Sequence, residues 1–176
     1  MRTHFILTIF FLFFVSLNVE SKIDPPNYNF SLDQLLPYYP GGSLKDLEQK
    51  KGEGDLVRKT STFIVKKFFI THVRYKFPVI VTASGDLILD MYTVLPSFFL
   101  HDVFHQSLIN RYGKQDTYKL FNGTAIYGWK DKSKMKLFYS STCTITCFPL
   151  YFSVTTNDPA PAGFLPMIQA LNEGHL

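Results

Sequence analysis

Two histidines stand four residues apart in a stretch whose apolar pattern predicts a helix over residues 97–112. At this spacing the imidazoles of His101 and His105 share one helix face, one turn apart, as they do in helices that bind zinc. Both fall on the apolar side of the helix, so we expect them to be packed. Asp102 stands where the metalloprotease motif has glutamate, and the sequence names no third ligand.

The histidine pair therefore allows three interpretations. The first is a pair of core or boundary residues whose ring nitrogens hydrogen-bond to the backbone or to a polar neighbour. The second is metal ligation, and the third is acid or base catalysis. We adopt the first interpretation and keep a metal site at His101 and His105 as the alternative.

The two cysteines of the chain, Cys143 and Cys147, could form a disulfide or bind a soft metal. In an extended strand their Cα atoms would lie roughly 13 Å apart, so a bond requires a tight turn or bulge between them. An even cysteine count and an oxidising destination favour the disulfide. Two unpaired thiols and a metal site remain open, and a four-ligand site would also include His101 and His105.

Two resemblances accompany these residues. The run from Cys143 to Pro149 resembles the copper motif of cytochrome oxidase assembly proteins, which implies copper, but those proteins have a distant downstream histidine and only His175 follows here. The stretch from Arg111 through Gly113 into aromatic hairpins resembles small bacterial envelope domains of the outer-membrane assembly lipoprotein type. This chain lacks the lipid-bearing cysteine of such lipoproteins, so no function is transferred.

The helix over residues 97–112 is expected to begin at Ser97 as its cap and to end before Gly113. Strands are expected on both sides of it, with a tight hairpin at Asn122 and Gly123. Before the helix, alternation over residues 62–77 indicates a half-buried strand. One parity is expected to face the core: Phe63, Val65, Phe69, Val73, Tyr75 and Phe77.

Short elements are expected at both ends of the domain. Prolines and glycines interrupt residues 22–60, which permits an arm of short helices. One is predicted over residues 44–51, with Ser43 as its cap and Gly52 just past its end, and another after Ser31. Residues 158–176 are predicted to be a linker followed by a helix that starts at Pro166.

The start of the chain, residues 1–21, has the order of a secretory signal. A short basic start precedes an apolar run over residues 5–19, and charge returns at Glu20 and Lys22, so cleavage is expected before Lys22. The run falls short of the roughly 20 apolar residues that span a bilayer, so we expect no membrane span after cleavage. The mature chain is expected to be secreted or periplasmic and to form one domain over residues 22–176, with its core at residues 61–157.

Composition narrows the function classes. The chain is 46% hydrophobic and 16% aromatic, which is typical of a folded domain. Its net charge of +4 is spread along the sequence, whereas a nucleic-acid site would concentrate it on one face, so we expect no nucleic-acid partner. The sequence contains neither a Gly-x-Ser-x-Gly elbow nor a phosphate-binding glycine loop, and enzymatic activity is left uncertain but not favoured.

These observations together predict an α+β domain with a mostly antiparallel sheet packed by one long helix over residues 97–112. The favoured function is an exported, non-enzymatic envelope or extracellular domain that binds a protein or an envelope component, without a cofactor. The alternative is a zinc- or copper-binding or redox protein that uses His101 and His105 with Cys143 and Cys147.

Overall fold

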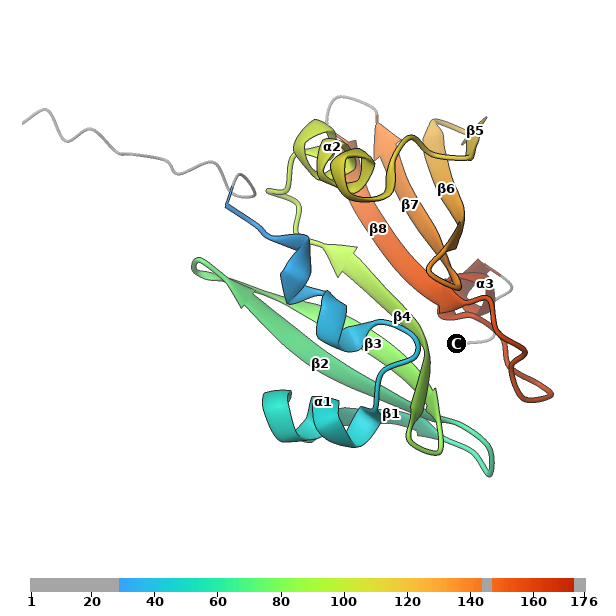
Figure 1. The fold of residues 1–176 in the computed structure, drawn as a ribbon. Coiled ribbons are helices and arrows are strands. Elements are labelled where there is room, and N and C mark those ends of the chain that lie inside the picture. Colours follow the sequence, from blue (N-terminus) through green and yellow to red (C-terminus); the bar gives the residue numbers. More distant parts are fainter. Residues whose placement is uncertain (1–28, 144–146, 173–176) are drawn as a thin grey trace, which may run out of the picture.

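The computed structural model describes residues 29–143 and 147–172, so the predicted secretory signal of residues 1–21 lies outside the described residues. Within them, one antiparallel sheet has the order β1-β2-β3-β4-β8-β7-β6-β5 (Figure 1). The strands are β1 (Asp55–Lys59), β2 (Ile64–His72), β3 (Tyr75–Ser84), β4 (Leu87–Leu95), β5 (Thr117–Phe121), β6 (Thr124–Lys132), β7 (Met135–Cys143) and β8 (Cys147–Thr156). The helical elements are η1 (Leu32–Gln34), η2 (Leu36–Tyr38), α1 (Leu44–Lys51), α2 (His101–Tyr112) and α3 (Met167–Asn172). The predicted α+β class with a mostly antiparallel sheet is confirmed.

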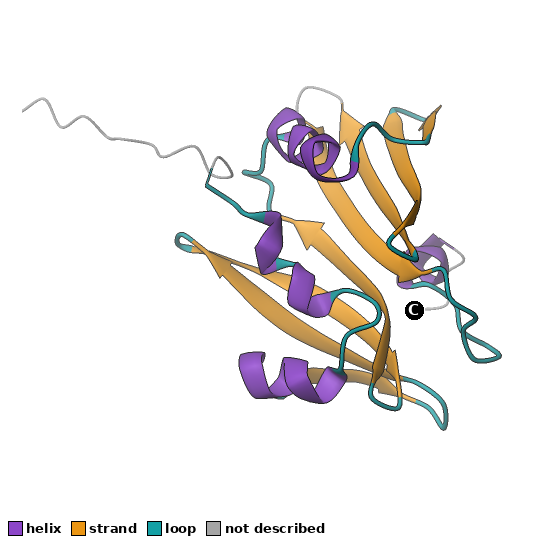
Figure 2. Ribbon diagram, viewed as in Figure 1, coloured by secondary structure: helices purple, strands orange, loops and turns teal. Residues whose placement is uncertain are grey.

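The sheet separates two unequal layers. Elements η1, η2, α1 and α2 lie on one face, and α3 lies behind the other (Figures 1 and 2). The main core fills the space under the first layer and joins Leu47 of α1 and Phe104 of α2 to strand residues such as Val154. The N-terminal elements therefore share a core with the sheet. On the opposite face a small cluster gathers Val65, Tyr92 and Met167 under α3.

The arrangement of elements repeats along the chain. Strand β6 starts the same number of residues after β2 as β7 starts after β3 and β8 after β4. Each set of four strands also follows a helix, α1 before β1–β4 and α2 before β5–β8. The two halves meet where β4 pairs with β8, through the partners Tyr92↔Ser153 and Thr93↔Phe152. Moving forward from Tyr92 by this number of residues gives Phe152, and moving back from Ser153 by it gives Thr93, so each pair is the equivalent of the other. The halves are therefore related by an approximate two-fold axis between β4 and β8. The sequence itself shows no repeat at a fixed period.

The predicted helix caps at the N-terminal end are confirmed. The Ser43 hydroxyl accepts a hydrogen bond from the backbone N–H of Asp46, and Gly52 follows the last residue of α1. Asp86 adds a contact that the sequence does not reveal, because its carboxylate accepts from the Ser43 hydroxyl and from the backbone N–H of Lys45. This carboxylate ties the start of α1 to the turn between β3 and β4.

The prediction of one long helix over residues 97–112 is wrong, because the helices of this fold are short and α2 begins at His101. Residue Leu100, not Ser97, precedes its first turn, and no side chain caps it. Residues 96–100 form a turn in which the backbone N–H of Phe99 donates to the Pro96 carbonyl. This turn buries the Phe99 ring and stacks Phe98 on Tyr75, which a continuing helix would not allow.

The face assigned to β2 is also wrong. Phe68, Ile70 and His72 are buried under the helices, whereas Phe69 and Val73 are exposed. The cause is the turn of residues 73–74, which pairs His72 with Tyr75. With this register, even positions of β2 lie beside odd positions of β3, so the apolar odd series cannot face the core on both strands.

The local signals for the later elements are confirmed. Asn122 and Gly123 both have positive φ, and they connect the paired residues Phe121 and Thr124 as a two-residue hairpin requires. Helix α3 begins next to Pro166, as predicted. Of the described helices, none is both long and apolar enough to cross a bilayer.

Candidate functional site

Helix α2 holds both histidines against the sheet, on the face that the sequence predicts. The His101 and His105 rings stack with centroids 5.5 Å apart, and each also stacks on Tyr139 of β7. Tyr127 of β6 lies 4.1 Å from the His105 ring, between centroids. The four side chains form a continuous ladder of rings between α2 and the β6–β7 hairpin, which we call the histidine–tyrosine ladder.

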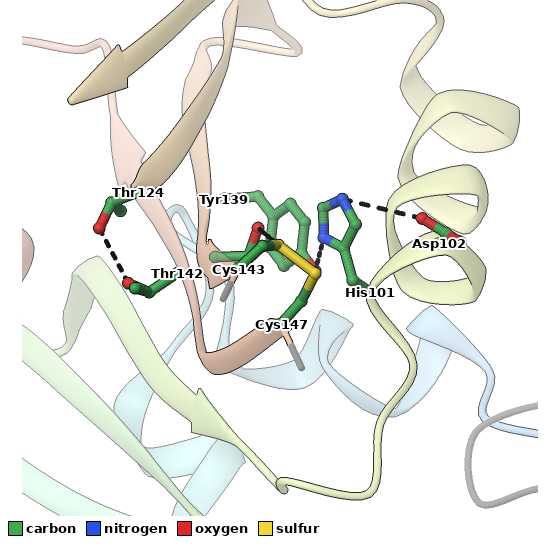
Figure 3. Close-up of a disulfide and its surroundings, with 8 residues drawn as sticks. His101, Asp102, Thr124, Tyr139, Thr142, Cys143 and Cys147 are labelled. Atoms are coloured by element: carbon green, nitrogen blue, oxygen red, sulfur yellow. Dashed lines mark hydrogen bonds and ion pairs between the residues drawn. A yellow bond between two sulfur atoms is a disulfide. The ribbon is translucent and has the colours of Figure 1, made fainter. Parts of the chain in front are cut away.

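Hydrogen bonding and burial fix the protonation state of this ladder. His101 Nδ1 and the Tyr139 hydroxyl share a hydrogen bond of 2.9 Å (Figure 3). Burial lowers the pKa of both histidines below the ordinary 6.5, so both rings are neutral at pH 7. Burial also raises the pKa of Tyr139 and keeps the phenol protonated. The unfolded chain protonates its histidines more readily, so the ladder loses stability as the pH falls below about 6.5.

The cysteines lie where β7 ends and β8 begins, at the connected end of the β7–β8 hairpin, and form a disulfide (Figure 3). Cys143 and Cys147 are backbone partners across that hairpin, so the chain reversal predicted as a requirement for the bond is present. The Ser141 hydroxyl approaches the Cys143 sulfur at 3.6 Å, and Cys147 packs against the main core. The disulfide therefore fastens the hairpin that carries Tyr139.

The donor atoms do not assemble as a metal site. Among residues 29–143 and 147–172, no three His, Cys, Asp or Glu side chains converge on one point. Both sulfurs are bonded to each other and His101 Nδ1 is bonded to Tyr139, which leaves His105 Nε2 as a buried nitrogen without a hydrogen-bond partner. Within the ladder, burial lowers the pKa of His101 and raises that of its hydrogen-bond partner Tyr139, which favours the neutral form of both groups.

Loss of the His101 ring is expected to cost stability. We expect His101→Ala to lower the free energy of unfolding by about 1–3 kcal/mol, because it leaves the Tyr139 hydroxyl unpaired and vacates half-buried space. Gln106→Ala is the matched control, since Gln106 is exposed on the same helix and bonds only to Asn110. Urea unfolding measures both variants, and equal losses would contradict a specific role for His101.

The second face of the sheet carries a set of side chains that the sequence did not reveal. Backbone pairing aligns Lys67, Ile80, Tyr92, Ser153, Phe138, Gly128 and Thr117 in one row across seven strands. A parallel row aligns Val94, Tyr151, Ser140, Ile126 and Lys119. Helix α3 packs over part of these rows, where Val65, Ile80, Tyr92, Val94 and Tyr151 gather under it, and the rows continue beyond it onto β7, β6 and β5.

Several apolar side chains on this face are partly exposed, although Ile80, Val94 and Tyr151 also pack against the cluster under α3. We define the open-face band as Phe69, Pro78, Ile80, Val94, Ile126, Phe138 and Tyr151, none of which is fully buried. Phe69 keeps 40% of its surface exposed. The band spans both halves of the repeat and crosses the β4–β8 junction, so it is one surface and not two.

Lysines surround the open-face band. Lys67 and Lys76 lie over the Phe69 ring at 5.5 and 4.3 Å from its centroid. Lys119 and Lys136 share this face further along the sheet, from their strand registers. Lys67 pairs with Asp55 at 3.5 Å, whereas the other three lysines have no acidic partner among the described residues. The face thus combines an apolar centre with excess positive charge.

Comparisons with protein families, with curated proteins and with solved structures find no match to this chain. The function must therefore be argued from the two features above, the histidine–tyrosine ladder and the open-face band. The ladder was visible in the sequence because its spacing is local. The open-face band was not, because it depends on the register between distant strands.

Proposed function

We propose that this chain is an exported, non-enzymatic domain that binds an acidic protein through the open-face band. The observation that carries the proposal is the sheet face that α3 covers only in part, where partly exposed apolar side chains of β2, β3, β4, β8, β7 and β6 lie in adjoining rows. Contiguous exposed apolar surface of this kind, rimmed by charge, is typical of protein interaction sites. Aromatic side chains such as Phe69, Phe138 and Tyr151 supply large contact area at low entropic cost.

The lysines indicate the chemistry of the partner. Lys76, Lys119 and Lys136 lack acidic partners within the described chain, so an acidic surface opposite them would gain attraction without losing an internal ion pair. Such rim charges accelerate association and select the partner more than they add affinity. We therefore assign a protein with an apolar centre and an acidic rim as the occupant, in preference to an uncharged surface.

Export is supported by the sequence and is compatible with the fold. The order of basic, apolar and small residues at the start of the chain is that of a secretory signal. A disulfide between Cys143 and Cys147 would persist in an oxidising compartment. We accordingly place the mature domain in a periplasm or outside the cell.

The histidine–tyrosine ladder receives a structural role in this proposal. Its rings fill the space between α2 and the β6–β7 hairpin, and its hydrogen bond to Tyr139 is internal. Catalysis would need an acid or base whose pKa lies near the working pH and that reaches a substrate. The neutral, packed imidazoles of His101 and His105 fit packing better.

Site-specific photo-crosslinking in the producing cells tests the proposal. A benzophenone amino acid at Phe138 is expected to trap one acidic protein, recovered with a mature chain that starts near Lys22. The same probe at Gln106, exposed on the opposite layer, is the matched control and should trap none. Charge reversal by Lys76→Glu with Lys136→Glu should remove the crosslink. Crosslinks of equal yield from both probe positions would contradict the proposal.

A further inference from the structure

A cavity of about 470 Å³ opens on the α3 side of the sheet, between the β1–β2 end and the chain that leads into α3. Its wall is apolar and is formed by Phe63, Val65, Phe164, Leu165, Met167 and Ala170. The Phe63 and Phe164 rings contact each other at an interplanar angle of 49°, with centroids 6.0 Å apart. Small-molecule sites commonly enclose several hundred cubic ångströms behind largely apolar walls, so the volume and lining fit a small ligand.

The side-chain polar groups of Arg58, Thr62 and Thr82 have no partner within the described part of the protein, and of these three residues only Thr82 is buried. Thr82 is buried in the wall, and its hydroxyl forms no hydrogen bond there. Arg58 lies at the exposed rim, and no acidic side chain among the described residues pairs with it. The hydroxyl of Thr60, by contrast, is already engaged with the backbone of Phe63.

The strand register places Arg58 and Thr82 on opposite sides of the cavity. Arg58 pairs with Val65, and Val65 pairs with Thr82, so the three residues lie in one row on adjacent strands. Neighbouring strands lie about 4.8 Å apart, which separates the Arg58 and Thr82 backbones by about 10 Å. An apolar floor, Val65, lies between a cation at the rim and a free hydroxyl inside.

The chain that closes the cavity is held in place from below. The backbone N–H of Met167 donates to Oδ2 of the buried Asp90 at 2.7 Å. Asp90 is also the strand partner of Thr82, so one residue links the floor of the cavity to its α3 wall. The wall is therefore anchored before any ligand enters.

We propose that this cavity binds a small hydroxylated aromatic acid, with its carboxylate on Arg58, its ring against the Phe63 and Phe164 side chains, and its hydroxyl on Thr82. A guanidinium matches a carboxylate with two parallel hydrogen bonds, which a lysine at the rim would not provide. The hydroxyl of the ligand would satisfy the buried hydroxyl that the wall leaves unpaired. This site shares no lining residue with the open-face band, and it does not depend on the proposed protein partner.

Calorimetric titration of the whole mature domain tests this assignment with 3-(4-hydroxyphenyl)propionate as the probe. We expect one saturable site, weakened about tenfold by Arg58→Gln, whereas Arg74→Gln at the far hairpin leaves it unchanged. Removal of the ligand hydroxyl, in 3-phenylpropionate, should weaken binding to the native domain about fivefold. The Thr82→Val variant should bind the two ligands with equal affinity, since the hydroxyl of Thr82 that would pair with the ligand hydroxyl is already absent.

Three results would overturn the proposal. The first is no saturable binding up to about 5 mM of the probe. The second is equal weakening by Arg58→Gln and Arg74→Gln, which would mean general attraction to a basic surface. The third is equal affinity for the acid and for 4-ethylphenol, which lacks the carboxylate. Circular dichroism of each variant establishes that it is folded before its affinity is compared.

Discussion

Phe104→Ala is expected to lower the free energy of unfolding by about 3–5 kcal/mol, as truncation of a large buried aromatic does. The Phe104 ring is 2% exposed and lies at the centre of the main core. Its centroid is 5.4 Å from that of Tyr139 and 5.7 Å from that of Phe152, and Phe30 of the N-terminal arm lies on another side. One ring thus joins α2, the sheet and the arm, and its loss leaves a cavity that no single element can close.

Urea unfolding followed by circular dichroism measures the Phe104 effect. Leu120→Ala provides the control, because Leu120 is 65% exposed on the edge strand β5 and its loss should change the free energy by less than about 0.5 kcal/mol. A Phe104→Ala variant as stable as the Leu120→Ala variant would mean that α2 does not dock on the sheet as described.

Asp90→Asn is expected to remove most of the pH dependence of stability between about pH 6.5 and pH 9, above the range in which the histidines change stability. Burial raises the pKa of Asp90 from its ordinary 3.8 to about 8. Between these two values the folded protein holds a proton that the unfolded chain has released. The contribution of Asp90 to the free energy of unfolding therefore falls as the pH rises from about 4 to about 8, by up to about 1.4 kcal/mol per pH unit, and levels off above.

The asparagine removes this charge and keeps a carbonyl oxygen that accepts from the backbone N–H of Met167. We expect Asp90→Asn and the native protein to unfold alike near pH 5, and the variant to be several kcal/mol more stable near pH 9. Asp86→Asn is the control, since hydrogen bonds lower the pKa of this exposed carboxyl and both folded and unfolded chains are ionised from pH 5 upward. A native protein whose stability is flat from pH 5 to pH 9 would contradict the burial of Asp90.

Local chemistry made much of this fold predictable from the sequence. The cap at Ser43, the end of α1 at Gly52 and the hairpin at Asn122 and Gly123 each depend on residues within one turn of each other. The burial of His101 and His105 followed in the same way, from helical periodicity. Such signals need no knowledge of distant parts of the chain.

Features that depend on distant contacts were not predictable. The face of β2 was assigned wrongly because the two-residue turn at Val73 sets its register, and alternation alone does not specify which face a helix will cover. The helix start was placed too early because Phe99 is drawn into the core beside Phe30 and Phe104. In both cases tertiary packing overrode a local pattern.

The structural repeat shows the same limit at the level of the whole chain. Equivalent positions of the two halves, such as Phe77 and Leu137 or Val79 and Tyr139, share burial but not residue identity. A search for sequence similarity therefore finds no period. The open-face band, which crosses the junction between the halves, could be recognised only once the pairing of β4 with β8 was known.

Binding through this band is the central claim, and affinity for the crosslinked partner tests it most directly. Phe69→Asp places a charge on the band, whereas Leu36→Asp places one on the helical layer at a side chain of similar exposure, 40% against 46%. We predict that Phe69→Asp lowers the affinity for the partner at least about a hundredfold, and that Leu36→Asp changes this affinity by no more than about twofold. Equal affinities for the two variants would show that the partner binds elsewhere.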